Sequence, residues 1–527
     1  MRSWQGPDSV GAAHTPARPI SEREARRSPW TTPSIALAFT TLLLHLAANG
    51  NYGFFRDELY LIVCGSRPDW GYVDQPALVP LLAAWSRAVF GDFVTGFRLL
   101  PALAMAATVA LTAEFTRTLG GGRFAQWLAG ACVALGPIFL LQGVLVSTDL
   151  FQCLTWLGIG WVLIQLDRTG EERWWLVFGA LVGFSLNSKY LIAFYLVALA
   201  PGLLVTPLRH SLRRPWIYLG ALLAFLLMLP NLLWQQMHDW PFIELGKAGA
   251  GGKNIAMSPA SFLLQQAVIT GPWASVVWLA GLWACIVRPR LSIAPAFAIA
   301  WVTLLLAFVG LHGKAYYLAA IYPTLLAFGA VRIEAWTANT ALRAAALAGV
   351  LLLGGAAAPM TLPILPVDLF MSYQRATGFM PSSGEHQTLG ALPQYYADMF
   401  GWREMAEKIA AVYASLPEED RAKAVFYGEN YGEAAAIDVF GRSLGLPPAI
   451  GGHNNYFIWG PGNNDGSVLI IIGGDTEHYA ELFRSYEVTG RIEAPLAMPY
   501  ETDKPIYVLR GMKTPLQTYW PDVKSYN

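Results

Sequence analysis

Charged residues are scarce in this chain, and neither sign is in excess. Asp, Glu, Lys and Arg make up only 14% of the 527 residues, with Lys plus Arg at 36 and Asp plus Glu at 36. The overall charge therefore gives no indication of nucleic-acid binding, which would favour an excess of basic residues, or of a cationic substrate, which would favour an excess of acidic ones. Apolar residues reach 54% and the mean hydropathy is +0.39. This composition indicates that a lipid bilayer is the solvent for much of the chain.

Nucleotide-binding and cysteine-based motifs are missing as well. The four cysteines form no CxxC pair, and the chain has neither a Walker P-loop nor a strand-GxGxxG-helix unit. The triplet Gly120-Gly121-Gly122 is predicted to be a short turn between two apolar runs. We therefore expect no structural disulfide, and a nucleotide sugar is disfavoured as a substrate.

Long apolar runs recur from residue 34 to about residue 365. A helix that spans a bilayer needs roughly 20 predominantly apolar residues, and about 11 runs approach this length. The predicted spans are 34–50, 94–116, 124–143, 149–166, 174–188, 190–207, 215–234, 260–287, 291–311, 315–331 and 344–362. The first follows an Arg-rich tail with no small-residue cleavage site, which is typical of a retained signal anchor.

The segment 77–90 decides the topology because it is short and contains Pro80 and Arg87. If this segment lies in the interface, the basic short loops all fall on the side of the Arg-rich N-terminus, as the positive-inside rule requires. We therefore predict an interfacial helix over 77–90, a cytoplasmic N-terminus and an outer face that carries the remaining loops.

The last 160 or so residues change character, with more Pro, Gly, Asn and charge. Short apolar runs at 424–427, 468–472 and 506–509 predict strands, and 402–416 has helical spacing. The predicted fold is an all-α polytopic transmembrane bundle of about 11 spans with interfacial helices, followed by a C-terminal soluble α/β domain. Its parts are a cytoplasmic tail (1–33), a transmembrane catalytic domain (34–365) and an extracytoplasmic domain (366–527).

The first outer loop carries two adjacent acids, Asp57 and Glu58, directly after Arg56. Carboxylates at a membrane edge can activate a hydroxyl nucleophile or hold a divalent cation, and a solvated charge pair gives the same pattern. Asp74-Gln75 follows in the same loop. Asp149 begins a later helix, where it is a candidate substrate ligand or an ordinary N-cap.

Two lysines lie at predicted outer helix ends, in Ser188-Lys189-Tyr190 and in His312-Gly313-Lys314. Each lysine is a candidate ligand for a lipid phosphate, and a snorkelling lysine explains the first position equally well. Tyr316 and Tyr317 follow, as sugar-stacking residues or as part of an interfacial aromatic belt.

These residues, in this order and spacing, resemble the GT-C class of membrane glycosyltransferases, in particular the protein O-mannosyltransferase and aminoarabinose-transferase-like group. The resemblance runs from about residue 30 to residue 335. It rests on the segments Arg56-Asp57-Glu58-Leu59-Tyr60, Gly71-Tyr72-Val73-Asp74-Gln75-Pro76, Ser147-Thr148-Asp149, Ser188-Lys189-Tyr190, Leu229-Pro230-Asn231 and Lys314-Ala315-Tyr316-Tyr317. It implies a polyprenyl-phosphate-linked sugar donor, an outer-face active site and inversion at the anomeric carbon, and it places the family's first-loop acid at Asp57.

An inverting transfer needs a base for the acceptor hydroxyl and cations for the departing phosphate. We assign Asp57 and Glu58 as catalytic, and Lys189, Lys314 and Arg56 to the donor phosphate. The expected acceptor- or sugar-binding residues are Asp74, Gln75, Asp149, Tyr316 and Tyr317. No cofactor is required by the sequence, and a divalent metal held by Asp57, Glu58 and His312 remains open.

The expected partners are the polyprenyl-phosphate-sugar donor, a lipid, glycan or protein acceptor and membrane lipids, with no nucleic acid. The expected location is the inner (plasma) membrane. Two other classes stay open: a transporter or lipid flippase, and a non-catalytic carbohydrate-assembly subunit. The first predicts ionisable residues at the bilayer midplane, whereas the charges here gather at predicted helix ends.

Overall fold

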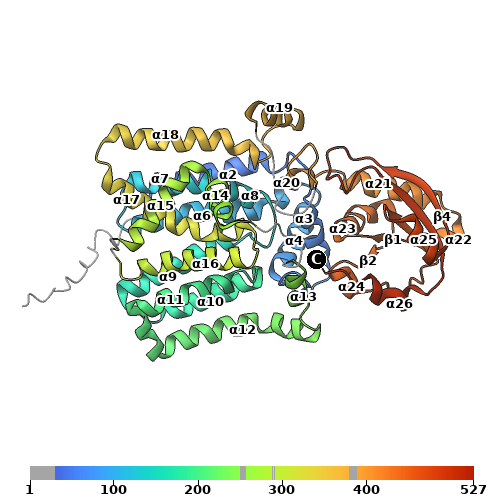
Figure 1. Ribbon diagram of the computed structural model, residues 1–527, viewed down its shortest axis with the longest axis horizontal. Helices are drawn as coiled ribbons and strands as arrows, with labels where there is room; N and C mark the ends of the chain where they lie inside the picture. The colour runs from blue at the N-terminus through green and yellow to red at the C-terminus, as the bar shows by residue number, and fades with distance from the viewer. Residues whose placement is uncertain (1–29, 250–256, 288, 290, 379–387, 527) are drawn as a thin grey trace, which may run out of the picture.

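The computed structural model describes residues 30–249, 257–287, 289, 291–378 and 388–526. Most of the predicted cytoplasmic tail lies outside the described residues, as does the Gly-rich stretch 250–256 between two of the predicted spans. The chain forms a bundle of roughly parallel long helices and a separate α/β domain, joined through a layer of short helices (Figure 1). A mostly helical bundle with a C-terminal sheet domain was predicted, and this coarse architecture is confirmed.

The long helices follow the predicted apolar runs closely. They are α2 (Thr32–Ala48), α6 (Leu99–Thr118), α7 (Arg123–Ala134), α8 (Pro137–Val144), α9 (Gln152–Thr169), α10 (Trp174–Ser188), α11 (Ile192–Val205), α12 (Pro215–Met237), α14 (Pro259–Thr270), α15 (Pro272–Ile286), α16 (Ala294–Gly310), α17 (Tyr322–Trp336) and α18 (Thr340–Ala357). Of the helices described, four are long and apolar enough to cross a membrane, and up to seven spans result if each of three bent pairs counts as one. Shorter apolar helices such as α10 and α16 accompany them. The count of about 11 spans stays a prediction.

The run 260–287 is broken rather than continuous. Gly271 has φ +89°, a conformation that glycine adopts without strain, and Pro272 then starts a new helix. The chain bends by 112° between α14 and α15. Segment 77–90 likewise forms its own short helix, α4 (Leu78–Phe90), packed against α3 (Arg56–Ser66).

The loops gather in two sets at opposite ends of the bundle. The basic loops are tied together by hydrogen bonds from Arg168 to the Thr118 carbonyl (2.8 Å) and from Ser211 to Glu172 (3.1 Å). At the other end Asn231 donates to the carbonyl of Trp70 (3.0 Å). Short elements also lie at this end: α5 (Val94–Phe97), α13 (Pro241–Ala248), η3 (Ala315–Ile321), η4 (Ala358–Met360), α19 (Val367–Thr377) and α20 (Gln394–Ala397). The element η1 (Pro207–Arg213) lies among the basic loops, where its Ser211 contacts Glu172. We call the first set the basic end and the second the site end.

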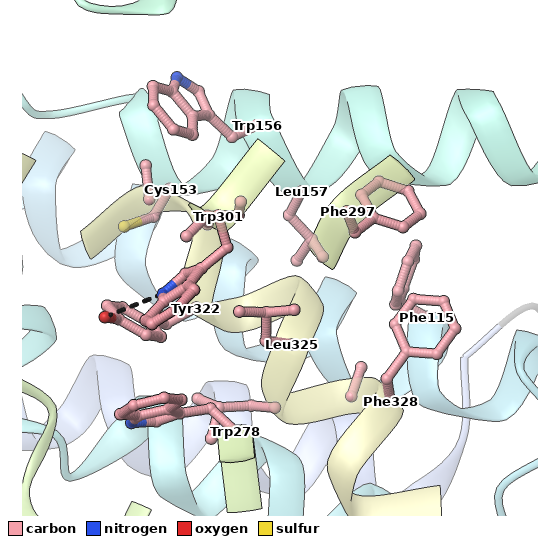
Figure 2. Packing of buried hydrophobic residues seen from close by; sticks show 14 of the residues in the cluster. Phe115, Cys153, Trp156, Leu157, Trp278, Phe297, Trp301, Tyr322, Leu325 and Phe328 are labelled. Atoms are coloured by element: carbon pink, nitrogen blue, oxygen red, sulfur yellow. Dashed lines mark hydrogen bonds between the residues drawn. The ribbon is translucent and has the colours of Figure 1, made fainter. Parts of the chain in front are cut away.

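Aromatic side chains fill the centre of the bundle. The Trp301 indole donates to the hydroxyl of Tyr322 of α17 (3.3 Å), and the Trp278 ring lies 5.3 Å from the Tyr322 ring (Figure 2). Further along α17, Phe328 contacts Phe115 and Phe297. Helices α15 and α17 approach through glycines, because a Cβ at Gly329 would stand 1.7 Å from the Val277 carbonyl oxygen. Close glycine contacts of this kind are a common way for membrane helices to associate.

The C-terminal domain has a five-stranded mixed sheet in the order β2-β1-β3-β5-β4. Its strands are β1 (Ala424–Gly428), β2 (Ile450–Gly451), β3 (Val468–Ile472), β4 (Phe483–Ile492) and β5 (Lys504–Met512). Its helices are α21 (Trp402–Ser415), α22 (Glu418–Arg421), α23 (Tyr431–Phe440), η5 (Gly441–Leu444), α24 (Asn455–Trp459), α25 (Thr476–Leu482), α26 (Leu516–Tyr519) and η6 (Trp520–Val523). The predicted strands at 424–427, 468–472 and 506–509 are confirmed, as is the predicted helix over 402–416.

One hydrophobic core joins the two parts of the chain. Buried residues of α3 and α4, such as Leu59 and Val79, belong to the same cluster as Trp402, Phe440 and Ile470 of the C-terminal domain. Helix α23 packs directly on α3. This shared core holds the C-terminal domain over the helix that begins with Arg56 and Asp57.

Candidate active site

A cavity of about 350 Å³ lies at the site end, between the bundle helices and the short elements that connect to the C-terminal domain. Its walls come from the start of α3, from α8, α14, η3 and α20. Five of the residues singled out in the sequence line it: Arg56, Asp57, Asp149, Lys314 and Tyr316. The fold thus brings together acids and cations from three distant segments of the chain.

Asp57 occupies the first turn of α3, where a carboxylate is favoured by the helix dipole. Its side chain is 43% exposed. One oxygen, Oδ1, accepts a hydrogen bond from the hydroxyl of Tyr431 (2.7 Å) and lies 3.5 Å from Nε of Arg56. Asp57 therefore presents a held but accessible carboxylate to the cavity.

Glu58 has a different environment, although it is the next residue. Its side chain is fully buried and forms an ion pair with the equally buried Arg98 (Nη2 to Oε2, 2.7 Å). The backbone amides of Phe55 (2.8 Å) and Val146 (3.0 Å) donate to the two carboxylate oxygens. Arg98 also donates to the carbonyls of Asn49 and Gly53. Glu58 therefore ties the start of α3 to Arg98, which directly precedes α6, and to Val146, just after α8. This geometry removes Glu58 from the set of candidate bases.

Lys189 reaches the cavity through Asp149. The Lys189 ammonium forms an ion pair with Oδ2 of Asp149 (2.7 Å), and both side chains are largely buried. The same nitrogen lies 5.5 Å from the ring centroid of Tyr316 and 5.3 Å from that of Tyr317, within cation–π range. Lys189, Asp149 and the two tyrosines form one group.

Lys314 directly precedes η3 and lines the cavity, whereas His312, two residues earlier, is exposed and not part of its wall. Asp74 accepts a hydrogen bond from Tyr60 (3.3 Å). Gln75 is buried in the first loop, with its amide 4.0 Å from the sulfur of Cys64. Asp74, Gln75 and His312 therefore lie apart from the cavity-lining set.

The three metal candidates do not form one donor set. Both oxygens of Glu58 already accept hydrogen bonds, and His312 does not line the cavity that holds Asp57. Over the described ranges, no group of three or more His, Cys, Asp or Glu side chains converges as a metal ligand set. The residues present do not fit the proposed metal, and we derive no step through one. All four cysteines are free and buried.

Three residues that the sequence did not single out surround Arg56. Its guanidinium donates to the Tyr500 hydroxyl (2.7 Å), which in turn donates to Asp398 (3.3 Å), while Tyr431 packs beneath it. Burial raises the pKa of Asp398 to about 6, although the Arg56 charge opposes this shift. All three lie more than 300 residues beyond Arg56, so no local pattern could have linked them to it.

Known proteins resemble this chain in sequence and in fold. Residues 74–234 match the family described as Dolichyl-phosphate-mannose-protein mannosyltransferase. A search of curated proteins finds no match. The structure is similar to that of ArnT from Cupriavidus metallidurans bound to undecaprenyl phosphate, with 15% identity, a TM-score of 0.59 and coverage of 90% of this chain and 97% of that chain.

The apo form of the same ArnT gives a TM-score of 0.55 at 15% identity, covering 90% of this chain and 96% of that one. Arabinofuranosyltransferase AftD from Mycobacteria gives 0.50 at 14% identity, and the match covers 91% of this chain but only 40% of AftD. Identities this low show the fold alone. The chain therefore has the fold of ArnT, and the resemblance to the GT-C class predicted from its sequence is confirmed.

Proposed function

We propose that this protein is an inverting glycosyltransferase that moves a sugar from a polyprenyl-phosphate-linked donor to an acceptor hydroxyl. The observation that carries the proposal is the site-end cavity, in which the Asp57 carboxylate and the Lys314 ammonium line one space of about 350 Å³. A base and a phosphate-binding cation are the two groups that this reaction requires. The shared fold with ArnT, solved with undecaprenyl phosphate bound, supports the class of donor.

In this mechanism Asp57 accepts the proton of the acceptor hydroxyl as its oxygen attacks the anomeric carbon. Lys314 and Arg56 stabilise the negative charge of the departing polyprenyl phosphate. An ammonium has three N–H donors, so Lys189 keeps donors for a phosphate oxygen while it is paired with Asp149. Tyr316, at the cavity wall, offers a ring face to the sugar.

A second, apolar cavity provides a place for the prenyl chain. It has a volume of about 680 Å³ and is lined almost entirely by apolar side chains of α10, α11 and α12, from Trp175 near the basic end to Tyr190 at the site end. Helix α10 has 15 residues and therefore a length of about 22 Å at 1.5 Å per residue. Since Lys189 directly precedes Tyr190, a chain in this groove places its phosphate beside the Lys189–Asp149 pair.

We further propose that the site end faces the outside of the inner (plasma) membrane. The basic short loops lie together at the opposite end, and short loops rich in Lys and Arg are retained in the cytoplasm. The N-terminus is then cytoplasmic, and the C-terminal domain is extracytoplasmic. An acceptor lipid, glycan or protein reaches the cavity from that side.

Binding of undecaprenyl phosphate to the purified full-length protein tests the donor class. Replacement of Lys314 by Met removes a charge-assisted hydrogen bond, which is worth about 1.5–3 kcal/mol, so affinity should fall roughly ten- to hundred-fold. Lys513→Met, on the surface of the C-terminal domain, is the control and should bind as the parent does. Failure of the parent to bind, or equal binding by both variants, contradicts the proposal.

A transfer assay with a panel of undecaprenyl-phosphate-linked pentoses and hexoses then identifies the sugar. Cell-envelope lipids, glycans and proteins are supplied as separate acceptor fractions. The anomeric configuration of the product, read by NMR, should be opposite to that of the donor.

A further inference from the structure

The C-terminal domain reaches into the candidate active site through one side chain. Tyr431 is the first residue of α23, and its hydroxyl lies 2.7 Å from Oδ1 of Asp57. The Nε of Arg56 approaches the same oxygen at 3.5 Å. Among the residues that the structure describes, both contacts to the Asp57 carboxylate therefore fall on Oδ1, and the second oxygen, Oδ2, faces none of them and is available to a substrate.

The Tyr431 ring is held on several sides. Its centroid is 4.7 Å from that of Tyr60 and 4.9 Å from that of His453, and the Arg56 guanidinium lies 5.3 Å above it. Burial raises the pKa of the Tyr431 phenol well above its usual value, and the Asp57 carboxylate acts in the same direction. The phenol thus stays protonated and donates a hydrogen bond to Asp57 in a fixed direction.

The start of α23 is itself fixed against α3. Asn430 caps the helix by accepting hydrogen bonds from the amides of Gly432 (2.9 Å) and Glu433 (3.0 Å). Gly432 allows close approach, because a Cβ there would stand 2.5 Å from Cγ of Arg56. The backbone that carries Tyr431 is therefore seated directly on the residue next to Asp57.

We infer that Tyr431 is a positioning residue that orients the Asp57 carboxylate for catalysis, so that the C-terminal domain completes the active site rather than only covering it. The inference rests on the proposed function. Catalysis depends on reacting groups held in near-attack geometry, and a carboxylate free to rotate about its side-chain bonds loses this advantage. Tyr431 acts through Asp57 and does not need to touch the substrate.

The test compares Tyr431→Phe with a matched control, Tyr456→Phe. Both changes remove a phenol hydroxyl of the C-terminal domain that donates to an aspartate, since Tyr456 donates to Asp438 at 2.9 Å. Only Tyr431 reaches Asp57. With the undecaprenyl-phosphate-linked sugar found in the panel assay, Tyr431→Phe should lower kcat roughly ten-fold or more, with the KM of the donor within about two-fold of the parent. Tyr456→Phe should leave kcat within about two-fold.

A readout without substrate separates this inference from the proposed function. The melting temperatures of Tyr431→Phe, Asp57→Ala and the double variant should not be additive, because each single change removes the one hydrogen bond that the two side chains share. Additive melting shifts, or equal kcat values for Tyr431→Phe and Tyr456→Phe, would overturn the positioning role while the proposed function stands. If the shifts were non-additive but the protein transferred no sugar, the proposed function would be contradicted, and the positioning role of Tyr431 in catalysis would be contradicted with it.

Discussion

Two adjacent acids at the start of α3, Asp57 and Glu58, have different environments and therefore different roles. Neighbouring residues of a helix point about 100° apart, so Asp57 faces the cavity while Glu58 faces the interior. The Glu58 carboxylate is compensated by Arg98 and two backbone amides, and it links three helices. The same charge is therefore proposed to serve catalysis at Asp57, and it stabilises the fold at Glu58.

Glu58→Gln should destabilise the protein more than it impairs chemistry. Removing one partner of a buried ion pair leaves the other charge uncompensated and costs about 3–5 kcal/mol. We expect a clearly lower melting temperature in detergent, whereas Asp57→Asn, at a side chain that is 43% exposed, should melt close to the parent. If the two variants melted alike, the structural assignment of Glu58 would be wrong.

The sequence could identify the charged residues that line the cavity but not the partners of those residues. Arg56, Asp57, Asp149, Lys189, Lys314 and Tyr316 stand out because they are polar residues at the ends of apolar runs. The ion pairs of Lys189 with Asp149 and of Glu58 with Arg98 depend on the direction in which each side chain points, which the sequence alone does not show. Tyr431, Asp398 and Tyr500 lie in a segment whose fold the sequence described only as α/β, so nothing pointed to them.

At the scale of elements, hydropathy located the helices well because lipid demands long apolar runs. Hydropathy could not show that the run 260–287 is two helices. Gly271 and Pro272 interrupt the helix there, but the run as a whole stays apolar. Strands β2 and β4 were also missed. Only two residues form β2, and eight of the ten residues of β4 are exposed or half-exposed and carry no long apolar run.

Glycine contacts between α15 and α17 give a prediction at this scale. Gly329→Ala places a methyl group 1.7 Å from the Val277 carbonyl oxygen, so the helices must separate, and we expect a lower melting temperature. Gly349→Ala in α18 is the control, because its Cβ meets nothing within 4 Å. That change should be neutral or stabilise by up to about 1 kcal/mol, as alanine favours a helix over glycine. Equal effects at the two sites would contradict the packing described for α15 and α17.

For the whole molecule, the C-terminal domain and the bundle share a core and a site. Buried residues of α3 and α4 pack with those of α21, α23 and the sheet, and Tyr431 and Tyr500 contact the two residues that open α3. The sequence predicted a separate domain on the same face as the site. It could not predict the contacts, because they join positions more than 300 residues apart.

The proposed orientation of the whole chain rests on the two sets of loops and can be tested by labelling. All four native cysteines are buried, so a cysteine introduced at Glu419 in the C-terminal domain should be the accessible thiol on that side. A membrane-impermeant maleimide added to intact cells should label Glu419→Cys. It should label Glu171→Cys, at the basic end, only after the membrane is opened. The reverse pattern would place the cavity on the cytoplasmic side.

The central claim, that the site-end cavity is a sugar-transfer site with Asp57 as its base, is tested most directly by Asp57→Asn. The amide keeps the size of the side chain but lacks the basic oxygen, and loss of a general base typically costs about 10² to 10⁴ in rate. We expect transfer from the undecaprenyl-phosphate-linked sugar to fall by at least 100-fold, while binding of undecaprenyl phosphate and the melting temperature stay near those of the parent. Transfer within a few-fold of the parent would contradict the account.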